Sequence, residues 1–339
     1  MRHKTDGTIQ KDLDDGIDTI GKKMTVCQLY AKQIRHRGNV RYNTKNGRKR
    51  LMKLLEEDKL GGCPIDSVKL SDAKEWAIRM KEKGISYKTI SNDKRSLKAA
   101  FYTAIQDDCI RKNPFDFQLN TVIEDDTEPK VPLTPAQEES FLSFAQNDKV
   151  YQKYYDELII LLGTGLRISE LCGLTDTDIN FENRIINVDH QLLRSAETGY
   201  YIETPKTKSG IRQIPMSEKV YEAFNRVLKR RRGAKAVTID GYSNFLFLNR
   251  DGYPKTATNY DGMFRGLAKK YNKYHEEALP KVMTPHTLRH TFCTNMANAG
   301  MNPKALQYIM GHSNITMTLN YYAHATFDSA KAEMLRIAA

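Results

Sequence analysis

Residues 284–292 read TPHTLRHTF, and this stretch decides how the second half of the chain is interpreted. Thr284 suits the N-cap of a helix, and Pro285 suits its first position. His286 and Arg289 then lie three residues apart, on one face of the first helical turn. Because the dipole and the unpaired N–H groups of a first turn favour an anion, the stretch predicts a helix that presents a histidine and an arginine to negative charge.

Other segments also carry residues that can bind an anion or take part in proton transfer. Residues 162–171 read LGTGLRISEL, where an apolar run ends at two glycines and a new helix is expected to start near Arg167. Residues 200–214 predict a β-hairpin, with strands at 200–203 and 211–214, a turn at Ser209-Gly210, and Lys208 just before that turn. Residues 310–324 contain a Gly-His pair at His312 and adjacent tyrosines at positions 321 and 322.

In this order and spacing, the segments resemble the tyrosine recombinase (phage integrase) family, and most of all the integrases of Gram-positive conjugative transposons. The resemblance covers about residues 24–335. It implies a site-specific recombinase that cleaves and rejoins DNA through a 3′-phosphotyrosyl intermediate and a Holliday junction, as in excision and integration of a mobile element. The catalytic residues that it implies are Arg167, Lys208, His286, Arg289, His312 and Tyr322.

The residue types fit that chemistry. The planar guanidinium groups of Arg167 and Arg289 stay charged and hold phosphate oxygens in pairs, so they would stabilise the charge that develops on phosphorus. A tyrosine hydroxyl would attack the phosphorus. The resemblance implies that Lys208 protonates the leaving 5′ oxygen and that His286 and His312 contact the phosphate or the tyrosine. Glu170 would orient Arg167 or a histidine.

Two positions have neighbouring alternatives. The pattern Thr-Leu-x-x-Tyr-x-His favours Tyr322 as the nucleophile over Tyr321, and only one of them can face the phosphate because adjacent helical residues point about 100° apart. Lys208 is favoured over Lys206 because the turn follows it directly. His286 and His290 have the spacing of a zinc pair, but no glutamate follows His286. No metal, nucleotide or redox cofactor is expected.

Basic charge is concentrated at the N-terminal end. Residues 1–112 contain 26 of the 53 Lys and Arg residues but only 15 of the 41 Asp and Glu residues. The rest of the chain is therefore nearly neutral. Such a basic region is typical of a protein that binds the phosphate backbone of double-stranded DNA. The expected phosphate contacts are Lys88, Lys94, Arg95 and Lys98.

The expected fold class is mainly α with a small antiparallel β-sheet, in two domains. Residues 1–23 are expected to form a polar tail or lead-in helix, and residues 24–114 a helical domain that resembles the family's core DNA-binding domain. Residues 115–132, which are acidic and contain prolines, are expected to be a linker. Residues 133–339 are expected to form the α+β catalytic domain, ending in an amphipathic helix over 327–337. Many such integrases carry an additional arm-binding domain, which we do not expect within these residues.

Composition excludes other classes. No apolar run approaches 18 residues and the polar N-terminus does not resemble a signal peptide, so we expect a cytoplasmic protein without a membrane partner. The five scattered cysteines form no C-x-x-C pair and are expected to be free thiols. The resemblance implies a tetramer on DNA, with an accessory excision factor as a further partner. The alternatives are a chromosome-dimer resolvase, a type IB topoisomerase-like enzyme and an inactive DNA-binding regulator.

Overall fold

The computed structural model describes residues 21–38, 40–128, 131–205, 207–231, 237–322 and Met334. The chain divides into two compact units, Met1–Pro129 and Lys130–Ala339, which we call the N-terminal and C-terminal units. Most of the expected helix over 327–337 lies outside the described residues. No helix in the described ranges is both long enough and apolar enough to cross a bilayer.

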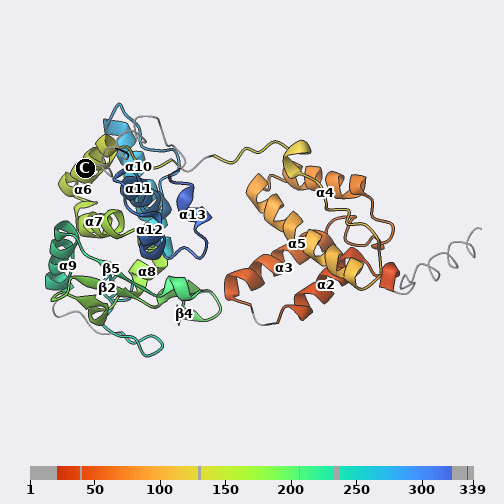
Figure 1. The fold of residues 1–339 in the computed structure, drawn as a ribbon, viewed down its shortest axis with the longest axis horizontal. Helices are drawn as coiled ribbons and strands as arrows, with labels where there is room; N and C mark the ends of the chain where they lie inside the picture. The colour runs from red at the N-terminus through yellow and green to blue at the C-terminus, as the bar shows by residue number, and fades with distance from the viewer. Residues whose placement is uncertain are drawn as a thin grey trace, which may run out of the picture. The chain divides into compact units, whose positions relative to one another are not determined.

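The N-terminal unit is helical, as the sequence predicts (Figure 1). Its elements are η1 (Gly21–Lys23), α2 (Val26–His36), α3 (Tyr42–Glu56), α4 (Leu70–Glu82), α5 (Tyr87–Gln106) and η2 (Leu119–Thr121). The helices bury an apolar core around Trp76 and Phe101. The sequence predicts that a long helix begins at Ser86 or Tyr87. Ser86 caps α5, because its side chain accepts a hydrogen bond from the Thr89 N–H, and this confirms that start.

Two boundaries in this unit differ from the prediction. Serine is a preferred N-cap, so the sequence predicts that Ser71 caps a helix over 72–83. The N-cap of α4 is instead Lys69, because Asp72 lies in the first turn and accepts a hydrogen bond from the Lys69 N–H at 2.8 Å. Residues 115–123 are not free linker, since Phe115, Leu119 and Ile123 are buried in the apolar core of the unit. The acidic run at residues 124–126 and the prolines that follow concealed the apolar residues just before them.

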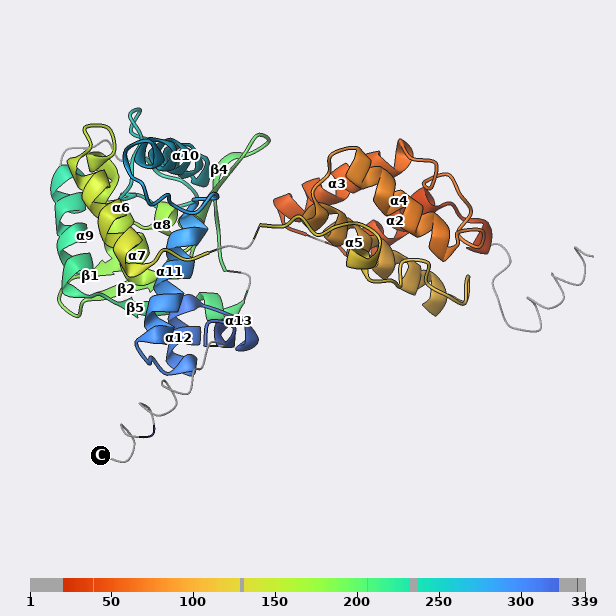
Figure 2. The same cartoon turned by 90° about the horizontal axis from the view of Figure 1, so that it is seen from above.

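The C-terminal unit is built on a layer of helices in which α7 packs between α9 and α11 (Figures 1 and 2). Its helices are α6 (Pro135–Asn147), α7 (Tyr155–Thr164), α8 (Ile168–Gly173), α9 (Glu218–Arg231), α10 (Ala257–Tyr274), α11 (Pro285–Asn298), α12 (Pro303–Met310) and α13 (Thr316–Leu319), with the short turns η3 (Gln152–Tyr154), η4 (Asp176–Asp178) and η5 (Lys208–Gly210). Thr134, which also precedes a proline, is predicted as an N-cap in the same way as Thr284, and both are confirmed.

The strands form two sheets rather than the single one expected. Strands β1 (Ile179–Asn180), β2 (Ile185–Val188) and β5 (Arg212–Pro215) form one antiparallel sheet, and β3 (Gln191–Ser195) pairs with β4 (Gly199–Glu203) in the other. The predicted hairpin of 200–203 with 211–214 is therefore wrong. Both strands exist, but β4 completes a hairpin with β3, whereas β5 crosses to pair with β2, with Ile186 opposite Ile214.

A glycine at the end of α7 allows three helices to meet. Gly165 has a φ of +63°, and a Cβ built there would lie 2.5 Å from Cδ1 of Phe292 in α11 and 2.9 Å from Sδ of Met310 in α12. Only glycine avoids both the left-handed backbone penalty and this overlap. The chain therefore turns directly from α7 to Arg167.

We predict that Gly165→Ala lowers the free energy of unfolding by about 3 kcal/mol, the sum of a left-handed backbone penalty and overpacking. The matched control is Gly199→Ala, since Gly199 also has a positive φ, of +70°, but has no atom within 4 Å of its built Cβ. The control should lose only about 1 kcal/mol. Urea denaturation measures both, and equal losses would contradict the close packing at Gly165.

Candidate active site

Four of the predicted catalytic residues lie at the ends of helices in the C-terminal unit. Arg167 is the N-cap residue of α8, His286 and Arg289 occupy the first turn of α11, and His312 follows the left-handed Gly311 that ends α12. Arg167 is hydrogen-bonded to Glu170 and to Gly311 O, and Arg289 to the adjacent Met310 O. His312 follows these carbonyls and is close enough to both arginines for their charges to affect it, so the four residues form one partly buried cluster.

Glu170 is the centre of this cluster. Its carboxylate accepts hydrogen bonds from Nη1 of Arg167 at 2.7 Å and from the backbone N–H of Arg167 at 2.8 Å. The same carboxylate accepts from Nη2 of Arg212 at 2.8 Å and Nη1 of Arg212 at 3.1 Å. Burial by itself raises the pKa of the Glu170 carboxyl. The hydrogen bonds and charge of Arg212, with the charges of Arg167 and Arg289, outweigh that effect and lower the pKa to about 2.

Arg289 is held by backbone carbonyls. Its Nη1 donates to Gly165 O at 2.5 Å, and its Nη2 donates to Met310 O. Burial and the nearby charge of Arg167 lower the pKa of Arg289 to about 9, which still leaves the guanidinium charged at neutral pH. Nη2 of Arg167 donates to Gly311 O at 3.0 Å, next to the carbonyl that Arg289 uses. The end of α12 therefore fixes both arginines.

His312 is a neutral side chain at physiological pH. It is buried, and its Nδ1 lies 3.0 Å from Oγ1 of Thr318 in α13. Burial and the positive charges of Arg289, Arg167 and Arg212 lower its pKa to about 4. The second ring nitrogen, Nε2, can thus act as a neutral hydrogen-bonding group toward a phosphate or a hydroxyl.

His286 and Lys208 lie outside the buried cluster. Both are exposed, His286 on the first turn of α11 and Lys208 at the start of η5. Lys206, the alternative to Lys208, lies outside the described residues. A long side chain on an exposed turn can reach a bound ligand, so this position fits the predicted role of Lys208 without establishing it.

The two adjacent tyrosines have different surroundings. The ring of Tyr321 packs 4.7 Å from that of His290, and its hydroxyl is electrostatically coupled to Arg289. The hydroxyl of Tyr322 instead donates to Met301 O at 2.5 Å. Burial raises the pKa of both phenols, and for Tyr321 the charge of Arg289 acts in the opposite direction. Of the two phenols, Tyr321 is the one whose pKa the charge of Arg289 affects.

Arg212 is a member of the cluster that the sequence analysis missed. Its side chain is fully buried on β5. The signal was present in the alternation of the strand, since Arg212 and Ile214 lie two residues apart and so share the inward face. A charged residue on such a face requires a buried partner, and Glu170 supplies it.

The four expected phosphate contacts in the N-terminal unit fall into two pairs. Lys94 donates to Phe117 O at 2.5 Å and lies over the Phe117 ring, while Lys98 pairs with Asp116 at 2.5 Å. These two lysines hold residues 115–123 against α5. Lys88 and Arg95 are exposed on the same helix.

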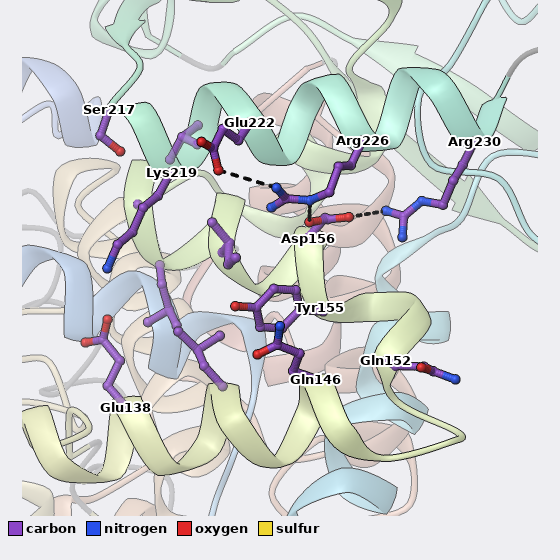
Figure 3. A pocket seen from close by; sticks show the side chains of 15 residues that line it. Glu138, Gln146, Gln152, Tyr155, Asp156, Ser217, Lys219, Glu222, Arg226 and Arg230 are labelled. Atoms are coloured by element: carbon purple, nitrogen blue, oxygen red, sulfur yellow. Dashed lines mark hydrogen bonds and ion pairs between the residues drawn. The ribbon is translucent and has the colours of Figure 1, made fainter.

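A groove and a polar cluster elsewhere in the described part of the C-terminal unit contain none of the predicted catalytic residues. Figure 3 shows a groove of about 620 Å³ between α6, α7 and α9, beside which Asp156 accepts hydrogen bonds from Arg226 at 2.8 Å and Arg230 at 2.5 Å. Within the described ranges, Asp178, Asp189 and His190 have ligand atoms close enough together for a cation. Both nitrogens of His190, however, already contact Asp189 and Gly173 O.

The fold and the cluster around Glu170 are those of a DNA strand-breaking and rejoining enzyme of the tyrosine recombinase class. A family model described as the phage integrase family matches residues 132–329, and the chain belongs to that family. The transposase from transposon Tn916 of Enterococcus faecalis is 69% identical over 329 residues, which cover 97% of this chain and 81% of that protein.

A more distant sequence relative and a solved structure support the same family. Tyrosine recombinase XerC of Bacillus subtilis is 26% identical over 265 residues, covering 78% of each chain. The structure of the Tn1549 transposon integrase in complex with a circular intermediate DNA shares 78% identity, with a TM-score of 0.88, over 93% of this chain and 99% of that one.

We predict that Glu170→Gln lowers the free energy of unfolding at neutral pH but not in acid. The folded pKa is lowered, so the ionised carboxylate stabilises the fold fully above its usual pKa of 4.5, and this contribution, on the order of a few kcal/mol, is lost as pH falls toward about 2. Urea unfolding at several pH values measures it. The variant should be less stable than the native chain at pH 7, and the difference should shrink below pH 4.5. A constant difference would show that Glu170 is not the group that titrates.

Proposed function

We propose that this recombinase excises and integrates a mobile element, and that Arg167, Arg289, His312, His286, Lys208 and Tyr321 form its active site. The observation that supports this most strongly is the joint fixation of Arg167, Arg289 and His312 at the end of α12, with Tyr321 beside Arg289. The Tn916 and Tn1549 relatives, both named for transposons, support the mobile element as substrate.

The arginines would bind one phosphodiester in the DNA backbone. Each guanidinium has more N–H donors than its contacts with Glu170 and backbone carbonyls use, so both can also donate to phosphate oxygens. Because they are fixed before DNA binds, little reorganisation is needed when negative charge develops on phosphorus. His312, neutral at Nε2, would hydrogen-bond a phosphate oxygen or the tyrosine, and His286 would act from the first turn of α11.

We favour Tyr321 as the nucleophile, although the sequence pattern favoured Tyr322. Tyr321 is coupled to Arg289, which lowers the energetic cost of its phenolate, whereas the Tyr322 hydroxyl is engaged with Met301 O. Structures of the Tn1549 integrase carry an arginine-to-lysine and a tyrosine-to-phenylalanine substitution whose positions differ by 154 in that protein's numbering. Arg167 and Tyr321 also differ by 154.

The reaction would conserve bond energy. As the Tyr321 oxygen attacks phosphorus, His286 accepts the phenol proton. The bond from phosphorus to the 5′ oxygen breaks and the Lys208 ammonium gives that oxygen a proton, so a 3′-phosphotyrosyl link and a 5′-hydroxyl result. Reversal with a 5′-hydroxyl from another duplex rejoins strands without ATP. Strands would exchange in pairs through a Holliday junction in a cytoplasmic tetramer, with an accessory excision factor setting direction.

The N-terminal unit would hold the DNA backbone. Its net positive charge fits that role, and the exposed Lys88 and Arg95 on α5 are the side chains that we assign to phosphate contacts. Lys94 and Lys98 were predicted for the same role. Their contacts with Phe117 and Asp116 favour a part in holding the unit together.

We predict that Tyr321→Phe abolishes the covalent protein–DNA adduct formed on a nicked suicide substrate built from the ends of the element. Tyr322→Phe should retain adduct formation within a few-fold, because it loses only the hydrogen bond to Met301 O. Protease-sensitive retention of DNA labelled at the 5′ end of the cleaved strand, which stays joined to the protein through its 3′ phosphate, measures the adduct in a denaturing gel.

Circular dichroism and DNA binding serve as controls for folding of both tyrosine variants. Adduct loss with Tyr322→Phe alone would reverse the assignment of the nucleophile while keeping the mechanism. A native chain that binds the substrate but forms no adduct would favour the regulator alternative.

We predict that Lys88→Ala and Arg95→Ala each weaken DNA binding and reduce the slope of log affinity against log salt by about 1, the effect of losing one phosphate contact. Lys94→Met should leave that slope unchanged and lower the unfolding temperature, because Lys94 holds Phe117. Fluorescence anisotropy across a salt series makes the measurement. A slope change for Lys94→Met as large as for Lys88→Ala would contradict the division between the two pairs.

A further inference from the structure

We propose that Arg212 is a positioning residue, which holds the turn that carries Lys208 against the phosphate-binding arginines. This inference rests on the function proposed above, in which Lys208 protonates the leaving oxygen. Arg212 lies on β5 with a fully buried side chain, so it does not touch DNA itself and acts through its neighbours.

The guanidinium of Arg212 joins three separate segments. It forms a two-point contact with the carboxylate of Glu170, at 2.8 and 3.1 Å, and Glu170 in turn holds Arg167. Its Nη1 also donates to Gly210 O at 3.1 Å, two residues beyond Lys208 in the same turn, η5. Its Nε donates to Ile309 O at 2.6 Å, near the end of the helix that precedes His312.

Arg212 and two of these segments, η5 and the end of α12, also pack closely around one glycine. A Cβ built at Gly311 would lie 3.0 Å from Ser209 O in η5, 3.1 Å from Nη1 of Arg212 and 3.2 Å from its Cδ. The end of α12 therefore lies directly against η5 and Arg212. A shift of any of the three changes the distance between the Lys208 turn and the carbonyl of Gly311, which holds Arg167.

Only arginine supplies this arrangement. Its planar fork can face a carboxylate with two N–H groups while the remaining N–H groups reach carbonyls to either side. A lysine at position 212 keeps the charge that Glu170 requires, but its single ammonium cannot reach the carboxylate, Gly210 O and Ile309 O in the same geometry. Arg212→Lys is therefore expected to loosen η5 while leaving the charge balance of the buried pair intact.

The chemical consequence is specific to the leaving group. When the bond from phosphorus to the 5′ oxygen breaks, that oxygen needs a proton, and Lys208 supplies it. If sulfur replaces that oxygen, the bond breaks to a thiolate, which is stable without a proton. A defect in proton donation is then relieved, while a defect in phosphate binding remains.

The experiment compares single-turnover cleavage of an ordinary suicide substrate with one carrying a 5′-bridging sulfur at the cleaved phosphate. The full-length native chain is assayed with Arg212→Lys, Lys208→Ala and Arg167→Lys. Arg226→Lys is the matched control, because Arg226 also pairs with a buried carboxylate, Asp156, but lies on α9 beside the groove in Figure 3. Each preparation is tested on both substrates, so any misfolded fraction cancels in the ratio of the two rates.

We expect Arg212→Lys to slow cleavage of the ordinary substrate roughly 100-fold, within the range for losing general acid catalysis, and to be less than roughly 10-fold slower on the sulfur substrate. Lys208→Ala should show the same relief, Arg167→Lys should be equally slow on both, and Arg226→Lys should match the native chain. Relief for Lys208→Ala without relief for Arg212→Lys would overturn the inference.

Absence of relief for Lys208→Ala itself would instead overturn the proposed role of Lys208, so the two failures are distinguishable. If Arg212→Lys does not fold, Gly210→Ala displaces the same turn from its other side, since a Cβ there would lie 2.3 Å from Cβ of Pro205. Gly210→Ala should show the same relief by sulfur. A defect of equal size on both substrates would contradict the coupling of η5 to proton donation.

Discussion

The carboxylate of Glu170 is the interaction on which the site depends. Two arginines from different elements, Arg167 and Arg212, share this one buried anion, and without it their charges would repel each other and Arg289 in a region with little water. Coulomb attraction is strong there because the surroundings are poorly polarisable. The low pKa of Glu170 is the expression of that attraction. A negative charge fixed at this point offsets the mutual repulsion of the three arginines.

The fold places the other groups around this anion by means of helix ends. The start of α8, the first turn of α11 and the end of α12 meet beneath the glycine turn at Gly165, and each contributes a charged side chain or a backbone carbonyl. The pocket is thus positive where a phosphodiester would lie, and the neutral His312 and the phenol of Tyr321 lie beside it. Since no part of this network requires the substrate for its assembly, the enzyme can apply its binding energy to the transition state.

Signals between residues close in sequence made the helix starts and the family predictable. Caps at Ser86, Thr134 and Thr284 depend on residues a few positions apart, and the order of the catalytic segments identified the family. The predictions that failed concerned contacts between residues far apart in the sequence. The partner of β5 is β2 rather than β4, and Phe115 packs into a core formed by residues far earlier in the chain. The choice between neighbouring tyrosines depends on Arg289 and Met301, and the role of Arg212 depends on a carboxylate 42 positions away. Spacing along the chain does not encode such contacts.

The most direct test of the central claim is a structure of this protein on nicked DNA with vanadate at the cleavage position, where vanadate stands in for the five-coordinate phosphorus. The account predicts an apical bond from vanadium to the Tyr321 oxygen, with N–H groups of Arg167 and Arg289 donating to equatorial oxygens and Glu170 still bound to both Arg167 and Arg212. An apical Tyr322 oxygen, or an Arg167 released from Glu170 to reach the vanadate, would contradict a pocket that is assembled before the substrate binds.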